Sequence, residues 1–142
     1  MEKYIGLDLG TTTLGIATSD FLGFVHGLET FRFKPDSYSL ARNRVHEVVK
    51  QTGIKNIVLG LPINMDGSEG FRAESSRKFK EDLEKEDPTL KIYLQDERLT
   101  TVSAHKTLNQ LNVSHQQRKD AVDRLAACEI LDFFLRIKEN KR

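Results

Sequence analysis

The chain has 142 residues, of which 38% are hydrophobic, and this length fits one compact domain with a single core. Lysine and arginine number 22 against 21 aspartate and glutamate, so the net charge of +1 excludes a strong overall basic field, and any surface that binds nucleic acid must be local. The single cysteine, Cys128, has no intrachain partner, which excludes a disulfide scaffold and favours a reducing compartment. No signal-peptide pattern opens the chain and no apolar stretch approaches the ~20 residues that span a membrane, so we expect a cytoplasmic protein.

The first third of the chain predicts three strands separated by turn-rich segments. Apolar and β-branched residues mark these strands at 3–8, 14–19 and about 25–33. The segment from Gly10 to Thr13 is short enough for a hairpin between the first two strands. We therefore expect an antiparallel meander.

Helices and strands alternate in the remainder of the chain. The first predicted helix runs from about Asp36 or Ser37 to Gln51, and Gly53 is its stop signal. Its inward-facing residues are predicted to be Leu40, Val45, Val48 and Val49. The elements that follow are a strand at 57–59, a helix at 71–86, a strand at 90–95, helices at about 100–111 and 116–137, and a frayed tail at 138–142.

This order of elements predicts an α/β fold with a mixed five-stranded sheet. Three strands are antiparallel, the last two run parallel to the first, and helices cover both faces. The last helix carries an apolar stripe fit for packing on the sheet, at Val122, Leu125, Ala126, Ile130, Phe133, Phe134 and Ile137. Ligands of such sheets collect at the carboxyl ends of the parallel strands.

Three acidic residues are predicted to meet at that end of the sheet. Asp8 ends the first strand, Glu97 follows the fifth, and Asp123 shares a helix face with the small residues Ala126 and Ala127. Carboxylate oxygens are the ligands that Mg²⁺ and Mn²⁺ prefer, so the three acids together indicate a metal site for phosphodiester cleavage. Taken singly, each acid has a structural alternative: a turn cap for Asp8 and a local ion pair for Glu97 or Asp123.

Four stretches of the chain resemble the YqgF family, also called RuvX. They are Ile5-Gly6-Leu7-Asp8-Leu9-Gly10, Gly60-Leu61-Pro62-Ile63-Asn64-Met65-Asp66-Gly67-Ser68, Asp96-Glu97-Arg98-Leu99-Thr100-Thr101 and Val122-Asp123-Arg124-Leu125-Ala126-Ala127. The resemblance covers the whole chain and implies one ribonuclease H-like domain, 1–142, related to the bacterial Holliday junction resolvases. It implies a nuclease that matures the 5′ end of pre-16S rRNA in ribosome biogenesis or, alternatively, resolves Holliday junctions in DNA recombination and repair.

The resemblance also implies roles for individual residues. Asp8 would bridge two Mg²⁺ or Mn²⁺ ions, and Glu97 and Asp123 would each complete one side. Arg98 would bind a phosphate, although an ion pair with Asp96 or Asp123 is an equal alternative on the sequence alone.

Two further positions are expected to bind substrate. Asn64, in the loop after the fourth strand, could meet a phosphate, unless this loop is a capped turn with Asp66 or Ser68 as helix N-cap. Arg124 is a candidate cation beside Asp123, together with Arg118 and Lys119.

One departure from the family concerns Thr12 and Thr13, which stand where relatives usually carry a basic pair. The stretch from Asp8 to Thr12 also resembles a phosphate-binding motif of the actin and heat-shock-protein ATPases, but 142 residues cannot supply their second domain. A third reading is a ribosome-assembly factor that binds RNA without cutting it. The expected partners are structured RNA, branched DNA and ribosomal precursor particles but no membrane, and the protein is expected to be a monomer or homodimer.

Overall fold

The computed structural model describes residues 2–98 and 115–140. Its strands are β1 (Tyr4–Leu9), β2 (Thr13–Ser19), β3 (Val25–Arg32), β4 (Asn56–Leu61) and β5 (Lys91–Asp96). Its helices are α1 (Tyr38–Thr52), α2 (Phe71–Glu86) and α4 (His115–Asn140). Each predicted strand and helix within the described ranges is present, and the bounds predicted for α2 are those observed. The helix predicted at 100–111 lies outside the described residues.

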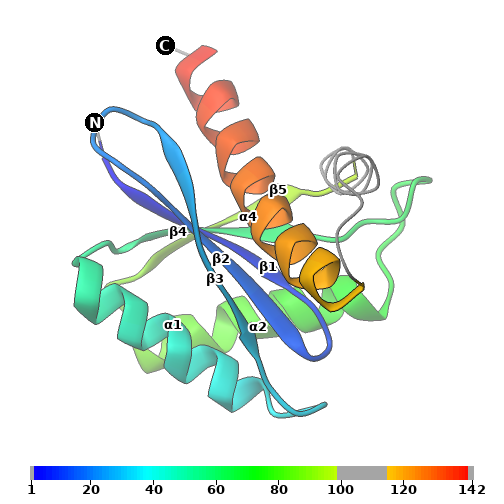
Figure 1. The fold of residues 1–142 in the computed structure, drawn as a ribbon. Helices are drawn as coiled ribbons and strands as arrows, with labels where there is room; N and C mark the ends of the chain where they lie inside the picture. Colours follow the sequence, from blue (N-terminus) through cyan, green and yellow to red (C-terminus); the bar gives the residue numbers. More distant parts are fainter. Residues whose placement is uncertain (1, 99–114, 141–142) are drawn as a thin grey trace.

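The strands form one five-stranded sheet in the order β3-β2-β1-β4-β5. β1 pairs antiparallel with β2, and β2 pairs antiparallel with β3. On its other side β1 pairs parallel with β4, which pairs parallel with β5 (Figure 1). The predicted mixed sheet is therefore confirmed, and the carboxyl ends of β1, β4 and β5 lie at one edge.

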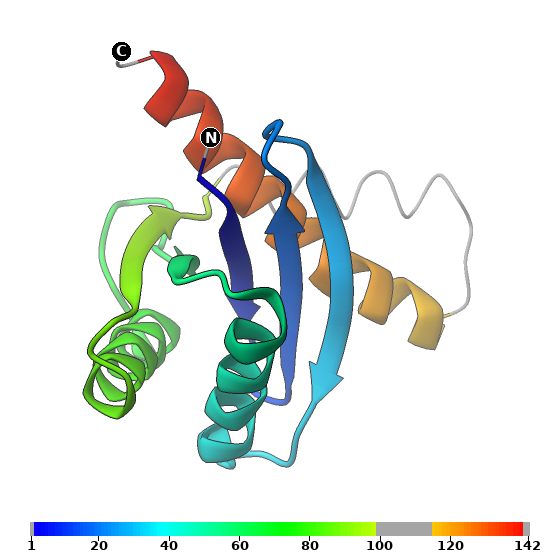
Figure 2. The ribbon, with the colours of Figure 1, turned by 90° about the vertical axis from the view of Figure 1, so that its left-hand side faces the viewer.

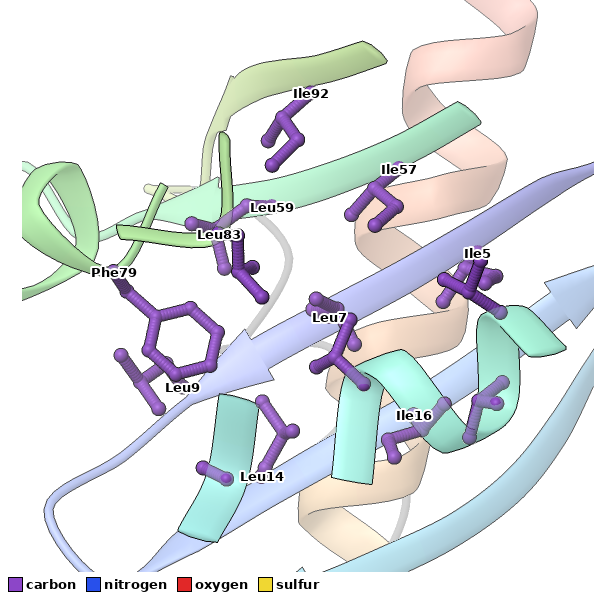
Figure 3. Packing of buried hydrophobic residues seen from close by; sticks show 14 of the residues in the cluster. Ile5, Leu7, Leu9, Leu14, Ile16, Ile57, Leu59, Phe79, Leu83 and Ile92 are labelled. Carbon is purple, nitrogen blue, oxygen red and sulfur yellow. The ribbon is translucent and has the colours of Figure 1, made fainter. Parts of the chain in front are cut away.

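Helices cover both faces of the sheet, with α1 and α2 on one face and α4 across the other (Figure 2). The larger core lies between the sheet and the first two helices, where Leu7 and Leu59 of the central strands pack with Phe79 and Leu83 of α2 (Figure 3). Because strand side chains alternate between faces, the residues next to Leu7 and Leu59 along each strand point toward α4. Asp8 and Gly60 are two of these.

Helix α1 buries a different stripe from the predicted one. Val45, Val48 and Val49 are buried as expected and Gly53 ends the helix at φ 74°, but Leu40 is 47% exposed and Ala41 is buried in its place. Neighbouring residues of a helix lie about 100° apart around its axis, and Ala41 has the i, i+4, i+7 spacing with the buried valines. The prediction for Leu40 was therefore wrong by one helical position.

Helix α4 packs close to the sheet because several strand residues beneath it are glycines. A Cβ atom placed on Gly6 of β1 would lie 2.8 Å from Leu131 Cβ and 2.9 Å from the carbonyl oxygen of Ala127. A side chain at this position would push the helix away, so the glycine sets how closely the two elements approach. The smaller core on this face includes Ala127, Ile130 and Leu131.

The apolar stripe predicted for α4 is correct only in part. Val122, Ala126 and Ile130 are buried, whereas Phe133 and Ile137 are 39% and 36% exposed. The side chain over Gly6 is that of Leu131, and Phe133, two residues further on, lies about 200° around the helix from it.

Helix α4 continues to Asn140, so it includes the first residues of the tail predicted at 138–142, and fraying of this tail stays a prediction. The Lys138 ammonium lies 5.5 Å from the centre of the Tyr4 ring, a cation–π contact between the last turn of α4 and β1. None of the helices in the described part of the chain is long and apolar enough to cross a membrane.

Candidate active site

Asp8 lies near the carboxyl end of β1, on the face covered by α4. Its neighbours Leu7 and Leu9 are buried in the larger core, so the alternation of the strand directs the half-buried Asp8 carboxylate to the opposite face. Its partner across the antiparallel pair with β2 is Gly15. The position is thus fixed by the apolar residues on either side of it.

Glu97 follows β5 and lies on the same face of the sheet. Its backbone amide donates a 3.2 Å hydrogen bond to the carbonyl of Leu61, which extends the pairing of β5 with β4 by one residue. Its side chain crosses the space above Gly60, where an added Cβ would lie 2.8 Å from the Glu97 carboxyl carbon. Only 7% of Glu97 is exposed, and its side chain is in hydrogen-bond contact with Asp8.

The contact between these two carboxyl groups changes how they bind protons. Burial raises the pKa of the Glu97 carboxyl to about 9, and the charge and hydrogen bond of Asp8 add to the increase. The positive charge of Arg72 acts in the opposite direction. Near neutral pH, the pair therefore holds a proton when no cation is bound.

Asp123 enters the site from helix α4, opposite Asp8. A Cβ at Gly15 would lie 2.0 Å from the backbone carbonyl oxygen of Asp123, so the helix rests on the strand residue that pairs with Asp8. The Asp123 Oδ2 atom is buried. The three acids predicted from separate parts of the chain thus come to one edge and one face of the sheet.

These acids fit a divalent cation by their chemistry, since all supply oxygen ligands and two are already in contact. Nevertheless, within residues 2–98 and 115–140 no group of three or more histidine, cysteine, aspartate or glutamate side chains is arranged to hold a metal ion. The structure therefore shows contact between Asp8 and Glu97 and places the Asp123 backbone against the neighbouring strand, while a metal site made by all three acids stays a prediction.

Arg98 forms the ion pair that the sequence left as an alternative to a phosphate contact. Its Nη2 atom lies 2.7 Å from Asp96 Oδ2, its Nε atom donates to the same oxygen at 2.8 Å, and its backbone amide donates to Asp96 Oδ1 at 2.9 Å. These contacts hold the pKa of Asp96 below its usual range. A role for Arg98 in binding phosphate stays a prediction.

Asn64 belongs to an internally bonded loop that precedes α2. Its Nδ2 atom donates to Ser68 Oγ at 3.0 Å, and Ser68 Oγ donates to Asp66 Oδ1 at 2.6 Å. Gly70 is the N-cap of α2, so the alternative that Asp66 or Ser68 caps this helix was wrong. These side chains close the loop instead, with Gly67 at φ 89°.

Arg124 follows Asp123 on α4, and its aliphatic stem lies near β3. A Cβ at Gly27 would be 3.7 Å from Arg124 Cβ and 3.9 Å from its Cδ. Arg118 and Lys119 were predicted as further cations, and their side chains are not among those that the structure describes. Arg124 is therefore the described member of this basic group, at the β3 side of the acids.

Thr12 and Thr13 form part of the tight turn between β1 and β2. The amide of Gly10 donates to the carbonyl of Thr13 at 2.7 Å, and the carbonyl of Thr12 accepts a 2.9 Å hydrogen bond from Phe33. Thr13 is only 4% exposed. The residues that replace the expected basic pair are thus held by the fold and bring no charge to the site.

Arg72, on the first turn of α2, lies beside the acids, and the sequence did not reveal this position. Its Nη2 atom donates a 3.2 Å hydrogen bond to the carbonyl of Leu9, directly after Asp8, and its charge acts on Glu97. An exposed arginine on a polar helix shows no spacing that marks it as functional. Only the pairing of α2 with the end of β1 places it there.

Comparison with known proteins supports a common family and fold. The family model described as "RuvX: Holliday junction resolvase" matches residues 2–137. A protein named "Putative pre-16S rRNA nuclease" from Staphylococcus saprophyticus is 41% identical over 135 residues, which cover 94% of this chain and 95% of that protein. A protein of the same name from Staphylococcus carnosus is 40% identical over the same length.

Solved structures of junction resolvases share the fold. Thermus thermophilus RuvC in complex with a Holliday junction substrate matches with a TM-score of 0.57 and 15% identity, covering 96% of both chains. The yeast mitochondrial Holliday junction resolvase matches with a TM-score of 0.51 and 10% identity, covering 97% of this chain and 81% of that one. At these identities the likeness confirms the RuvC-like ribonuclease H fold alone.

Proposed function

Because the chain belongs to the RuvX family, we propose that it is a divalent-metal-dependent nuclease that hydrolyses phosphodiester bonds in the 5′-end processing of pre-16S rRNA. The observation that carries this proposal is the contact between Asp8 and the buried Glu97 at the carboxyl ends of parallel strands, with the backbone of Asp123 on α4 packed against Gly15, the strand partner of Asp8. Burying carboxylates side by side is costly unless a proton or a cation offsets their charge. The arrangement is therefore more useful for holding a cation than for supporting the fold.

The residues that would hold the metal are Asp8, Glu97 and Asp123. Asp8 lies between the other two, since it touches Glu97 and its strand partner Gly15 lies against Asp123. Asp8 would therefore be the ligand shared by the Mg²⁺ or Mn²⁺ ions, and Glu97 and Asp123 would be the flanking ligands. Bound metal would supply an activated water and stabilise the leaving oxygen.

The chain itself prepares this site in two ways. Burial of Glu97 beneath α4 excludes water from one side of the pair, which strengthens its attraction for a cation. A proton on this pair offsets the repulsion between the two carboxyl groups, and a bound cation would take over that role. Around them we assign Arg98, Asn64 and Arg124 to substrate binding, although Arg98 and Asn64 would first have to exchange an internal partner for a phosphate.

Resolution of Holliday junctions is the second candidate. The description of the matching family model and the fold shared with RuvC favour it. Symmetric cleavage of a junction requires two active sites and hence a dimer, whereas trimming an RNA end requires one. The oligomeric state in solution bears on the choice between the two substrates.

Cleavage assays test the proposal. Purified protein with Mn²⁺ is given either a pre-16S rRNA fragment that carries the 5′ extension or a four-way DNA junction. We expect cleavage of the RNA, and Asp8→Asn should reduce the rate by at least about a hundredfold because it removes the bridging carboxylate. Asp132→Asn is the control, since Asp132 lies on α4 in an exposed ion pair with Arg136.

Each outcome of these assays has a definite meaning. Equal cleavage by the wild type and Asp8→Asn would reject the metal site. Preferential cleavage of the junction would favour the resolvase. Specific RNA binding without cleavage under any metal condition would favour an assembly factor.

A further inference from the structure

Most arginines in the described part of the chain are neutralised by carboxylates. Ion pairs with acidic side chains engage Arg32, Arg42, Arg44, Arg77, Arg98 and Arg136. Arg72 and Arg124 have no such ion pair with any described carboxylate. A phosphate competes poorly for a guanidinium that is already bound to a carboxylate. Arg72 and Arg124 are therefore the described arginines best able to bind a phosphate.

Of the two, Arg72 is the one whose guanidinium is hydrogen-bonded next to the carboxylate pair, at the residue after Asp8. It belongs to the first turn of α2 and donates from Nη2 to the carbonyl of Leu9, the residue after Asp8. This bond links α2 to the end of β1 and fixes where the guanidinium lies. A guanidinium has five N–H donors, and the bond to Leu9 uses one.

The guanidinium of Arg72 carries its positive charge to the residue after Asp8 without being paired to a described acid. This charge attracts the Glu97 carboxyl, but the two side chains form no ion pair of the kind that Arg98 makes with Asp96. Metal ions bound by the acids would reduce this attraction further and leave the arginine facing whatever anion approaches the metals. In a nuclease that anion is a phosphate.

We propose that Arg72 is a substrate-binding residue that contacts a phosphate of the nucleic-acid backbone beside the cleaved bond. The proposal rests on the nuclease function proposed above and names a residue of that same site. It also accounts for Thr12 and Thr13, because a cation from α2 restores positive charge to the edge of the sheet where the β1–β2 turn has none. The ligand is the phosphodiester backbone, which RNA and DNA share.

The test compares three variants: Arg72→Gln, Arg72→Lys and the control Arg77→Gln. Arg77 lies on the same helix and its removal changes the net charge equally, but it is bound to Glu69, with 2.6 Å between Nε and Oε1. Binding of a fluorescent pre-16S rRNA fragment and of a four-way junction is measured by anisotropy in EDTA across a range of salt concentrations. KM and kcat are measured with Mn²⁺, and thermal melting verifies that each variant is folded.

Loss of one phosphate contact has a recognisable signature. Arg72→Gln should raise Kd and KM about three- to tenfold and reduce the slope of log K against log salt by about 0.7 to 0.9, the value of one phosphate. Arg72→Lys should keep the salt slope but recover only part of the affinity, because lysine lacks the planar donor pair. Arg77→Gln should change affinity less than twofold.

Two results would overturn the assignment while leaving the nuclease function intact. The first is that Arg72→Gln cleaves with the same KM as Arg77→Gln and binds with the same salt slope. The second is that Arg72→Gln reaches half-maximal activity at a lower Mn²⁺ concentration than the wild type while its RNA binding is unchanged. Arg72 would then only offset the negative charge of the acids.

The two proposals can also be told apart when the nuclease fails. If Arg72→Gln weakens nucleic-acid binding but the wild type never cleaves, the phosphate contact is supported and the nuclease function is rejected. Absence of binding and cleavage on both nucleic acids would reject both proposals.

Discussion

At the residue scale, the site depends on two carboxyl groups that share one buried space. Leu7 and Leu9 determine the side of the sheet on which Asp8 lies, and Gly60 makes room for Glu97 next to it. Neither acid is remarkable in sequence, since each sits where a turn cap or an exposed ion pair is common. The burial of Glu97 and its contact with Asp8 are what mark the pair in the described chain.

The raised pKa of Glu97 predicts an unusual dependence of stability on pH in the metal-free protein. The pKa is about 9 in the folded state against an ordinary 4.5, so the folded chain keeps a proton that the unfolded chain releases. The contribution of Glu97 to the free energy of unfolding is therefore fully present below pH 4.5, and it is lost as the pH rises toward about 9. Glu97→Gln should flatten this decline.

Denaturant unfolding in EDTA at several pH values measures this effect. A tenfold change in proton affinity corresponds to about 1.4 kcal/mol, and we expect Glu97→Gln to be more stable than the wild type by about 1–3 kcal/mol at pH 8. Glu84→Gln, which alters an exposed glutamate bound to Lys80, should keep the wild-type slope. Parallel pH profiles for the wild type and Glu97→Gln would contradict the buried contact.

At the element scale, much of the fold was predictable because strand alternation and helix periodicity are local properties. The bounds of α2 and the order of the strands follow from such patterns, and so does the meeting of Asp8 with Glu97 at the ends of parallel strands. The rotation of a helix on the sheet is not local. Leu40 and Phe133 were misplaced because neighbouring elements, and not the apolar residues alone, decide which side of a helix is buried.

The position of Arg72 shows the same limit for the site. Its role depends on the approach of α2 to the end of β1, which no spacing within either segment encodes. By contrast, the close approach of α4 to the sheet near Asp123 was predictable, because the small residues Ala126 and Ala127 share its helix face. The sequence therefore predicts which residues pack closely on the sheet, but it does not predict which cationic side chains lie beside the acids.

Gly15 provides a test of how α4 positions Asp123. A Cβ at Gly15 would come within 2.0 Å of the Asp123 carbonyl oxygen, which is backbone and cannot rotate away. Gly15→Ala should therefore displace the helix, destabilise the protein by about 1–3 kcal/mol and greatly reduce cleavage. Gly27→Ala is the matched control, since its nearest atom, Cys128 Sγ, lies at an ordinary 3.5 Å. Unchanged stability and activity of Gly15→Ala would show that α4 does not depend on this contact.

At the scale of the whole molecule, the sheet separates stability from function. The larger core on the side of α1 and α2 contains most of the buried apolar residues, whereas the face under α4 combines a smaller core with the acids. The chain has a net charge of only +1, and most described arginines are paired with acids. Binding of nucleic acid therefore has to come from a few local cations and from metal, not from a general basic surface.

Metal binding should consequently stabilise the whole fold. A cation that binds the folded acids but not the unfolded chain adds about 2.7 kcal/mol at a hundred times its Kd, which corresponds to about 5–10 °C in Tm for a domain of this size. We expect Mn²⁺ to raise Tm by this amount at pH 8 and by less at pH 5, because protons compete for Glu97 at the lower pH. Asp8→Asn should lose most of the increase, whereas Asp132→Asn, altered in an exposed pair on α4, should retain it. Equal increases in both variants would mean that the metal binds at a site without Asp8. Calorimetric titration would then show the same metal binding in the wild type and in Asp8→Asn.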